Sequence, residues 1–237
     1  MGGSKLKNAT QLAMPVRKIP KNYLSVTGTF SSAKNGKSLG YESLLERDLM
    51  ILLEFDDTVE GFEEQPVKVP VVANGKKLKP YVPDILIHYL PTTSGEARRP
   101  VLGEVKDTKD LKKNKAKYAP KFEAASRYAE ERGWEWKIFT DKDIRTPYLD
   151  NLKFLRQYHS EVPDAALLQE ASLYLQNTRG SVTVDSLLKK LCPTEDKFLH
   201  MVPAIWHLVA TKRITANLQK PLTMTSKLSW AERNNHD

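Results

Sequence analysis

The chain has 237 residues, of which 40% are hydrophobic, enough for one large domain or two small ones with real cores. Its single cysteine, Cys192, excludes an internal disulfide and a cysteine-based zinc site. The formal charge of +8 indicates a polyanionic partner, whereas the longest apolar run, residues 49–53, is too short to span a membrane. No signal peptide is visible, so we expect a bacterial-type cytoplasmic protein with no membrane partner.

The first two thirds of the chain predict one α/β domain with a mixed sheet, at residues 21–160. A flexible basic arm at residues 1–20 precedes this domain. The expected helices lie at 41–55, at 115–132 before a Gly133 cap, and at 141–158 with an interruption near Pro147. The expected strands lie at 23–30, 58–62, 67–72, 82–89, 101–106 and 134–139, with turns at 31–40 and at Asn74-Gly75.

A boundary at residues 161–164 separates this domain from a shorter, helical region. We expect a winged helix-turn-helix domain at 161–228, followed by a polar tail at 229–237 in which Trp230 docks on the protein. Such domains bind DNA or protein, and the sequence leaves both open. The expected helices span 165–175, 183–191 and 195–210, and the two strands of the wing span 214–218 and 222–228.

Two of the expected strands carry acids and a lysine at informative positions. Asp84 follows Pro83 at the start of one strand, and Glu104 and Lys106 alternate along the other. Alternate residues of a strand share a face, so Glu104 and Lys106 project side by side while Val105 enters the core. Two carboxylates provide the hard oxygen ligands that Mg²⁺ prefers, and a lysine can hold an attacking water or a phosphate. The grouping suggests metal-dependent phosphodiester hydrolysis, but a solvated surface ion pair is an equal alternative, and a third element has to decide between them.

A third acid lies on the helix predicted at residues 41–55. Glu46 shares a helical face with Leu49, Met50 and Leu53, where a carboxylate is costly to bury without a partner. A metal ion or Lys106 would be that partner. Alternatively, Glu46 lies at the rim of the face and contacts Arg47 or Lys37, and Glu42 is a rival for the same role.

A run of lysines directly follows the Glu104 strand. Its position beside an acidic centre suits phosphate contact, because DNA must be drawn onto a locally anionic pocket. Charge runs are also common on solvated faces. The candidate DNA-binding residues are Lys109, Lys112, Lys113, Lys115 and Lys117.

Several ordered motifs together resemble a known family. The run TGTFSSAKNGKSLGYESLLERDLMILLEFDDTVEGFEEQP, followed by YVPDILIHY, GEVK and WKIFTDKDI, is similar to the TnsA endonuclease subunit of heteromeric transposases. The resemblance covers residues 20–158 well and the C-terminal region more loosely. It implies a restriction-endonuclease-like fold of the PD-(D/E)xK superfamily, followed by a winged-helix domain.

The resemblance also implies roles for individual residues. Glu46, Asp84, Glu104 and Lys106 would be catalytic, and the three acids with the Val105 carbonyl would hold one or two Mg²⁺ ions, with Mn²⁺ able to substitute. Lys106 would orient or deprotonate the water. Gln65 is an accessory candidate near the metal or the DNA. Such enzymes cut the 5′ ends of the transposon, a TnsB-like recombinase cuts and joins the 3′ ends, and a TnsC-like AAA+ regulator activates both.

Two other interpretations remain at this stage. One is a stand-alone nuclease of the restriction or resolvase type, and the other is a catalytically inactive winged-helix adaptor that binds DNA. The sequence does not indicate the DNA sequence preference, the oligomeric state or the way in which a target is selected.

Overall fold

The computed structural model describes residues 26–231, so the basic arm expected at 1–20 and the end of the expected tail lie outside the described residues. The chain divides into two compact units between Ile144 and Arg145. This division lies earlier than the boundary that the sequence predicts near residue 161. The reason is that α5 (Pro147–Ser160) packs within the second unit, where the Phe154 ring contacts the Trp206 ring edge-on at 5.3 Å.

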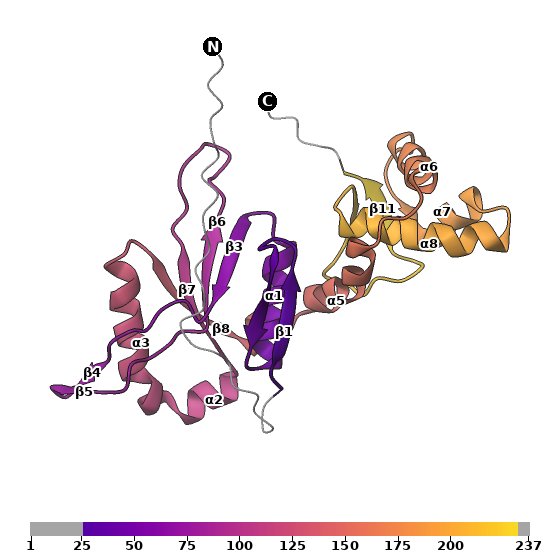
Figure 1. Ribbon diagram of the computed structural model, residues 1–237. Coiled ribbons are helices and arrows are strands. Elements are labelled where there is room, and N and C mark those ends of the chain that lie inside the picture. The colour runs from indigo at the N-terminus through magenta and orange to yellow at the C-terminus, as the bar shows by residue number, and fades with distance from the viewer. Residues whose placement is uncertain (1–25, 232–237) are drawn as a thin grey trace, which may run out of the picture. The chain divides into compact units, whose positions relative to one another are not determined.

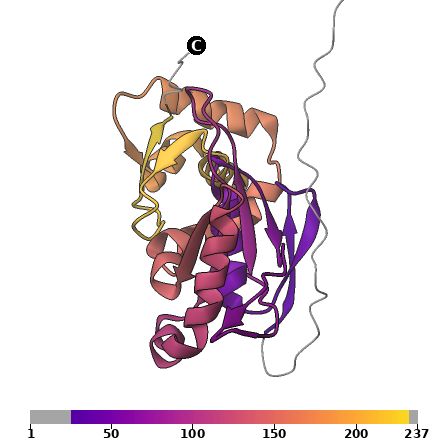
Figure 2. The ribbon, with the colours of Figure 1, turned by 90° about the vertical axis from the view of Figure 1, so that its left-hand side faces the viewer.

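Within the described residues, the first unit is built around a four-stranded mixed sheet. The strands β3, β6 and β7 pair antiparallel, and β7 and β8 pair parallel, as expected for an α/β domain. One face of the sheet is covered by α1 (Leu44–Phe55) and the other by α3 (Lys115–Glu130) (Figures 1 and 2). In order across the sheet, the strands are β3 (Val59–Glu64), β6 (Ile85–Tyr89), β7 (Val101–Lys106) and β8 (Glu135–Thr140).

Helix α1 begins three residues later than the sequence predicts. Tyr41 instead pairs with Gly28 in a hairpin of β1 (Gly28–Ser32) and β2 (Lys37–Tyr41), so only the tip of the turn predicted at 31–40 is a turn. Ser43 then caps the helix, because its hydroxyl accepts a hydrogen bond from the amide of Glu46. The hairpin fixes the point at which α1 starts, and therefore the position of the acids in its first turn.

The strand predicted at residues 67–72 is reduced to a single bridge between Val69 and Tyr81 and a two-residue strand, β4 (Val72–Ala73). Pro66 and Pro70 interrupt this segment, and a proline has no amide hydrogen to give to a ladder. The remaining elements of the unit are β5 (Lys76–Lys77), α2 (Thr108–Lys113), which the sequence did not predict, and α4 (Asp141–Ile144).

Gly103 is required for close packing in the middle of the sheet. A Cβ atom added there would lie 2.7 Å from the Phe139 ring and 2.9 Å from the Ile85 side chain. We expect Gly103→Ala to lower the free energy of unfolding by about 2 kcal/mol, because overpacking forces neighbouring side chains to move. Chemical denaturation checks this value. The glycine in the exposed turn, Gly75, has a φ of +72° but open space around it, so Gly75→Ala should cost less, about 1 kcal/mol. An equal loss in both variants would contradict the packing argument.

The second unit consists of helices around one core and a small sheet. The expected helices appear as α6 (Ala165–Gln176), α7 (Val184–Leu191) and α8 (Glu195–Ala210). Asn151 of α5 joins the unit together, because its buried amide donates to the carbonyls of Leu218 and Lys220 and accepts from the amide of Leu222. The sheet has the order β10 (Ile214–Ala216), β11 (Lys227–Trp230) and β9 (Val182–Thr183).

Trp230 is part of β11 and packs against the core of the second unit, so the tail predicted from residue 229 begins later. Three helices followed by a hairpin are the elements that the sequence predicts for a winged helix-turn-helix, but the assignment to that class stays a prediction. Among residues 26–231, no helix combines the length and the apolar character that crossing a membrane requires.

Candidate functional site

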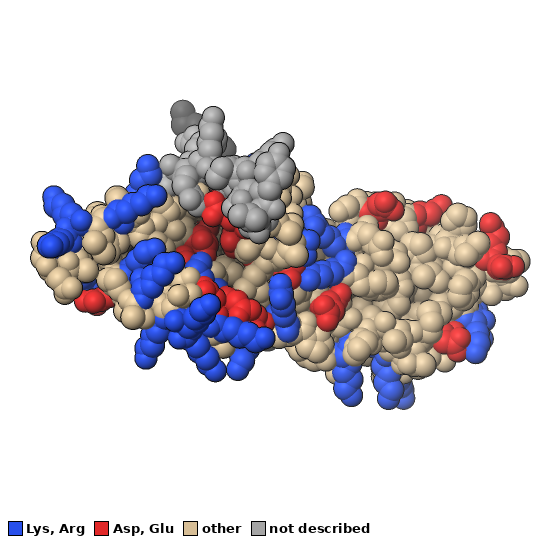
Figure 3. Space-filling model, turned by 90° about the horizontal axis from the view of Figure 1, so that it is seen from below, with Lys and Arg blue, Asp and Glu red and all other residues tan. Residues whose placement is uncertain are grey.

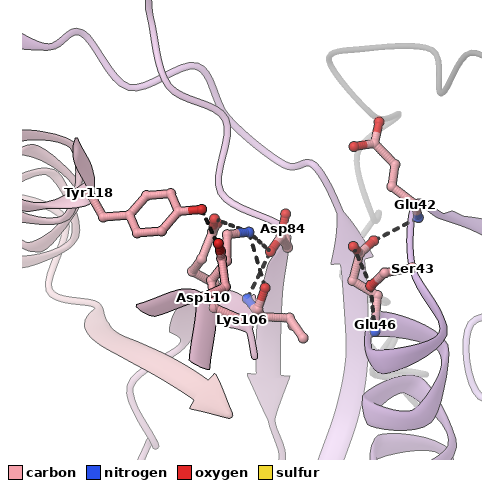
Figure 4. A network of polar contacts seen from close by, with 9 residues as sticks. Glu42, Ser43, Glu46, Asp84, Lys106, Asp110 and Tyr118 are labelled. Atoms are coloured by element: carbon pink, nitrogen blue, oxygen red, sulfur yellow. Dashed lines mark hydrogen bonds and ion pairs between the residues drawn. The ribbon is translucent and has the colours of Figure 1, made fainter. Parts of the chain in front are cut away.

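Asp84, Glu104 and Lys106 meet at the end of the β6–β7 pair. The Lys106 ammonium lies 2.7 Å from Glu104 Oε1 and 3.7 Å from Asp84 Oδ2. It also donates a hydrogen bond of 3.1 Å to the main-chain carbonyl of Val105. The ammonium therefore contacts three oxygens that are expected metal ligands, and Figure 4 shows it pointing toward Asp84.

The ladder between β6 and β7 holds the three side chains in place. Ile85 pairs with Gly103, and the amide of Asp84 donates to the carbonyl of Gly103 at 3.0 Å. Two residues further along β7, the amide of Val105 donates to Asp84 Oδ2 at 2.8 Å. The carboxylate therefore takes the place of a main-chain acceptor. Asp84 is thus fixed by the sheet itself, and Glu104 and Lys106 lie on the same side of β7.

Glu46 faces this cluster from the first turn of α1 without touching it. Its carboxylate accepts hydrogen bonds from the Glu42 amide and the Ser43 hydroxyl, both at 2.8 Å, so it forms a reciprocal capping box (Figure 4). If Glu46 lay at the rim of the helix face, it would contact Arg47 or Lys37. It bonds Glu42 and Ser43 instead, and Arg47 bonds Asp48. Glu42 lines a cavity together with Asp84, so both acids of this turn border the site.

Burial and mutual repulsion raise the pKa values of the acids. For Glu104, burial and then the charge of Asp84 raise the pKa to about 8. For Glu46, burial and then Asp84 raise it to about 7. Burial also raises the pKa of Asp84, against the opposing effect of Lys106. The site therefore carries more negative charge than its one cation balances, and it takes up protons near neutral pH when no further cation is bound.

Lys106 remains charged over the physiological range. Burial opposes the charge, but the carboxylates of Asp84 and Glu104 outweigh it and raise the pKa of Lys106 above its ordinary value. In this state Lys106 donates hydrogen bonds and has no free lone pair. A charged lysine of this kind suits the orientation of a water or phosphate, and the two roles expected for Lys106 both stay predictions.

The raised pKa values predict a pH-dependent stability in the absence of divalent cations. Glu46 and Glu104 bind protons more tightly in the folded chain than in the unfolded chain, so stability falls as pH rises from about 4.5 to 8. We expect a loss of several kcal/mol in the free energy of unfolding across this window, measured by urea denaturation in EDTA. Glu104→Gln should flatten the profile. A stability that rises over the same interval would contradict these pKa values.

The oxygen donors of the site fit a divalent cation. Glu104 Oε2 and the Tyr81 hydroxyl are both buried, and the hydroxyl interacts with the Glu104 carboxylate, which partly offsets the effect of burial on the pKa of Glu104. Two carboxylates and the Val105 carbonyl are hard oxygen ligands of the kind that Mg²⁺ prefers. Within residues 26–231, no three acidic, histidine or cysteine side chains lie close enough to hold a metal by themselves. A metal at this site would therefore need waters or substrate oxygens, as Mg²⁺ usually does.

The other predicted residues surround this centre. Gln65 is buried, and its main-chain amide donates to the main-chain carbonyl of Asp84 at 2.9 Å, so Gln65 lies next to the site. Gln65 also has a positive φ of 46°, an uncommon conformation for a residue other than glycine. All five predicted DNA-binding lysines are exposed, and they lie on α2 and the first turn of α3: Lys109, Lys112, Lys113, Lys115 and Lys117.

A hydrogen-bonded pair next to Lys106, formed by Tyr118 and Asp110, was not predicted from the sequence. Tyr118 donates a hydrogen bond of 2.6 Å to Asp110, and its ring centroid lies 6.0 Å from the Lys106 ammonium. This hydrogen bond lowers the pKa of Asp110 and keeps it ionised. Asp110 lies on α2 and Tyr118 on α3. Because α2 was not predicted, the contact between these two residues could not be predicted either.

A sheet with this topology, carrying Asp84 opposite a Glu-x-Lys strand, defines a restriction-endonuclease-like nuclease domain. Two family models match the chain: the TnsA-like endonuclease N-terminal domain at residues 56–141, and the TnsA endonuclease C-terminal domain at residues 143–218. The chain belongs to the TnsA endonuclease family and is thus an endonuclease subunit of a transposase. A search of curated proteins found no match.

Proposed function

We propose that this chain is a divalent-metal-dependent endonuclease that cuts the 5′ ends of a transposon during cut-and-paste transposition. The observation that carries the proposal is the convergence of Asp84, Glu104 and Lys106 on one small volume, in a chain of the TnsA endonuclease family. Family membership supports the reaction class, and the donor set supports the metal.

The metal ligands would be the carboxylates of Asp84 and Glu104 and the carbonyl of Val105, with Glu46 facing them from α1. Mg²⁺ is the natural ion for such a set, and Mn²⁺ can substitute for it. When bound, the ion would stabilise the charge on the attacking and leaving oxygens of the phosphodiester. Burial and the charge of Asp84 raise the pKa values of Glu46 and Glu104, and a divalent cation at these oxygens would favour their ionised forms.

The side chains around the ion would position the substrate. The charged Lys106 donates hydrogen bonds, so it would orient the attacking water or a phosphate oxygen. Asp84 cannot rotate freely, because the Val105 amide holds its Oδ2. The exposed lysines of α2 and α3 would bind the phosphate backbone and offset the repulsion between DNA and the acids. Hydrolysis would leave a 5′-phosphate and a 3′-hydroxyl.

The proposed partners are the DNA of the transposon ends, a TnsB-like recombinase that processes the 3′ ends, and a TnsC-like AAA+ regulator. These partners come from the family to which the chain belongs. A division of labour between two nucleases requires that each cuts a different strand, and strand choice is therefore the property to measure.

The test is a cleavage assay on transposon-end DNA, with and without the co-expressed recombinase, in which the cut strand is mapped. We expect cuts at the 5′ ends that need both Mg²⁺ and the recombinase. Cleavage by the purified chain alone would instead favour a stand-alone nuclease. Unchanged cleavage in EDTA would contradict the metal, and no 5′ cut under any condition would favour an inactive adaptor.

A further inference from the structure

The cavity that Glu42 and Asp84 line also has a basic side. It has a volume of about 570 Å³, and its lining includes Tyr81 and three lysines, Lys68, Lys79 and Lys121. Within residues 26–231, none of these lysines pairs with a carboxylate, although Lys121 lies 5.8 Å from the centroid of the Tyr81 ring. Three lysines that form no ion pair with a carboxylate of the described residues therefore line the same cavity as Asp84, one of the candidate catalytic acids.

The fold holds two of these lysines on a short arm, residues 68–81, which we call the lysine arm. Its base is an antiparallel bridge in which the amides of Val69 and Tyr81 donate to each other's carbonyls at 2.7 and 2.9 Å. Val69, Val71 and Tyr81 are buried in one cluster with Ala124 and Ala125 of α3. Lys68 and Lys79 are exposed, so the arm buries its apolar residues against α3 and leaves these lysines at the cavity.

The third lysine comes from the element against which the arm packs. Lys121 is partly buried on α3, and the Phe122 ring that follows it lies 6.4 Å from the Tyr81 ring. The three ammonium groups are thus carried by two elements that share one core. An arrangement held by packing loses less conformational freedom when a ligand binds than three lysines on a mobile loop would.

The surface around the candidate site shows the same charge pattern. Seen from below, acidic side chains lie in a hollow of the first unit, and Lys and Arg side chains gather around it (Figure 3). A nuclease must hold a polyanion over buried carboxylates, and phosphates recur along each DNA strand at every nucleotide. When one phosphate is at Asp84, its neighbours on the strand must lie close by, and the basic cavity adjoins Asp84.

We infer that Lys68, Lys79 and Lys121 form a second phosphate site, which binds a DNA backbone phosphate flanking the one that is cut. The inference rests on the proposed function, because it assumes that the scissile phosphate lies at Asp84. Such a site would fix the register of the strand in the active centre and would carry no sequence preference, since a phosphate contact reads no base.

The test is a double-mutant cycle between lysines and individual phosphates. The variant Lys68→Gln/Lys79→Gln removes two exposed charges, and Lys76→Gln/Lys77→Gln, at the tip of the same arm, is the matched control that does not line the cavity. The DNA is transposon-end duplex in which one phosphate at a time near the cut is a neutral methylphosphonate. The readout is the cleavage rate of the assembled transposase, with thermal denaturation to verify the fold.

For the wild type, we expect one flanking methylphosphonate to slow cleavage about tenfold. The variant Lys68→Gln/Lys79→Gln should be slow on unmodified DNA and show no further loss at that position, while the control keeps the full methylphosphonate effect. Lys121→Gln should reduce the effect at the same phosphate. The inference is overturned if Lys68→Gln/Lys79→Gln keeps the full effect at every position, or if the control loses it equally.

The same cycle, measured as equilibrium binding of the duplexes in EDTA at low salt, does not depend on cutting. A wild type that binds and shows this coupling but never cuts would refute the proposed function and leave the phosphate site standing. Cleavage at the 5′ ends without any coupling between the lysines and a flanking phosphate would support the proposed function and refute the phosphate site.

Discussion

Asp84→Asn is expected to reduce DNA cleavage by about three orders of magnitude, the scale of losing a central electrostatic group in an active site. The asparagine removes the negative charge but keeps an oxygen that can accept from the Val105 amide, so the β6–β7 ladder is preserved. Burial raises the pKa of Asp84, which means that its ionised form destabilises the fold. The variant should therefore be at least as stable as the wild type at neutral pH.

The measurement is the rate of 5′-end cleavage by the assembled transposase in Mg²⁺, together with a urea denaturation curve of the variant. Asp150→Asn, an exposed acid on α5, is the control for the same change of charge and should cut normally. Asp84→Asn that cuts at the wild-type rate would remove Asp84 from the reaction. A loss of cleavage together with a loss of folding would identify a structural role instead.

Lys106→Met is expected to have the largest effect on stability. Its ammonium is the cation that contacts Glu104 and Asp84, and removing one partner of a buried ion pair leaves uncompensated charge. We expect the free energy of unfolding in EDTA to fall by about 3 kcal/mol at pH 9. At pH 6 the loss should be smaller, because Glu104, whose pKa is already raised to about 8 by burial and by Asp84, then binds a proton and needs no cation.

Urea denaturation at the two pH values checks this prediction. Added Mn²⁺ should restore part of the lost stability, because a divalent cation at the same oxygens replaces the missing ammonium. Lys137→Met, an exposed lysine on β8, is the control and should change stability little at either pH. An equal loss at pH 6 and pH 9 would show that the lysine acts through its packing rather than its charge.

The main elements of the nuclease unit follow from local sequence patterns. The alternation in Val101–Lys106 places Glu104 and Lys106 on one side, and the structure brings them within 2.7 Å. The apolar spacing of α1 places Leu49, Met50 and Leu53 in the core. Such patterns have the periods of strands and helices, and they predict the face of each side chain without knowledge of the partner element.

Pairing between distant segments could not be predicted in the same way. The strand β2 lies where the sequence indicates a turn, because five residues of mixed character pair with β1 only in the folded chain. The capping box between Ser43 and Glu46 has a recognisable spacing, S-x-x-E, yet that spacing does not show whether the glutamate also faces Asp84. In the structure, Glu46 both bonds the capping residue Ser43 and faces Asp84.

The basic cavity was missed for a related reason. Lys68 and Lys79 are separated by a proline, Pro70, and a turn, and Lys121 lies on a helix far along the chain. No run of charge connects them, so composition alone favours the continuous run on α2 and α3. The alternation of Val69 and Val71 is the sequence pattern that could have revealed the lysine arm. Both valines are buried, and the residues on either side of them then lie on the outer face.

The proposed activity requires that the carboxylates of Asp84 and Glu104 bind a divalent cation. Isothermal titration of Mn²⁺ into the wild-type chain, into Asp84→Asn and into Glu104→Gln at pH 7 tests it most directly. We expect the wild type to bind Mn²⁺ with release of protons, since Glu46 and Glu104 have raised pKa values, and we expect much weaker binding by both variants. Equal Mn²⁺ binding by all three proteins, or none by the wild type, would contradict it.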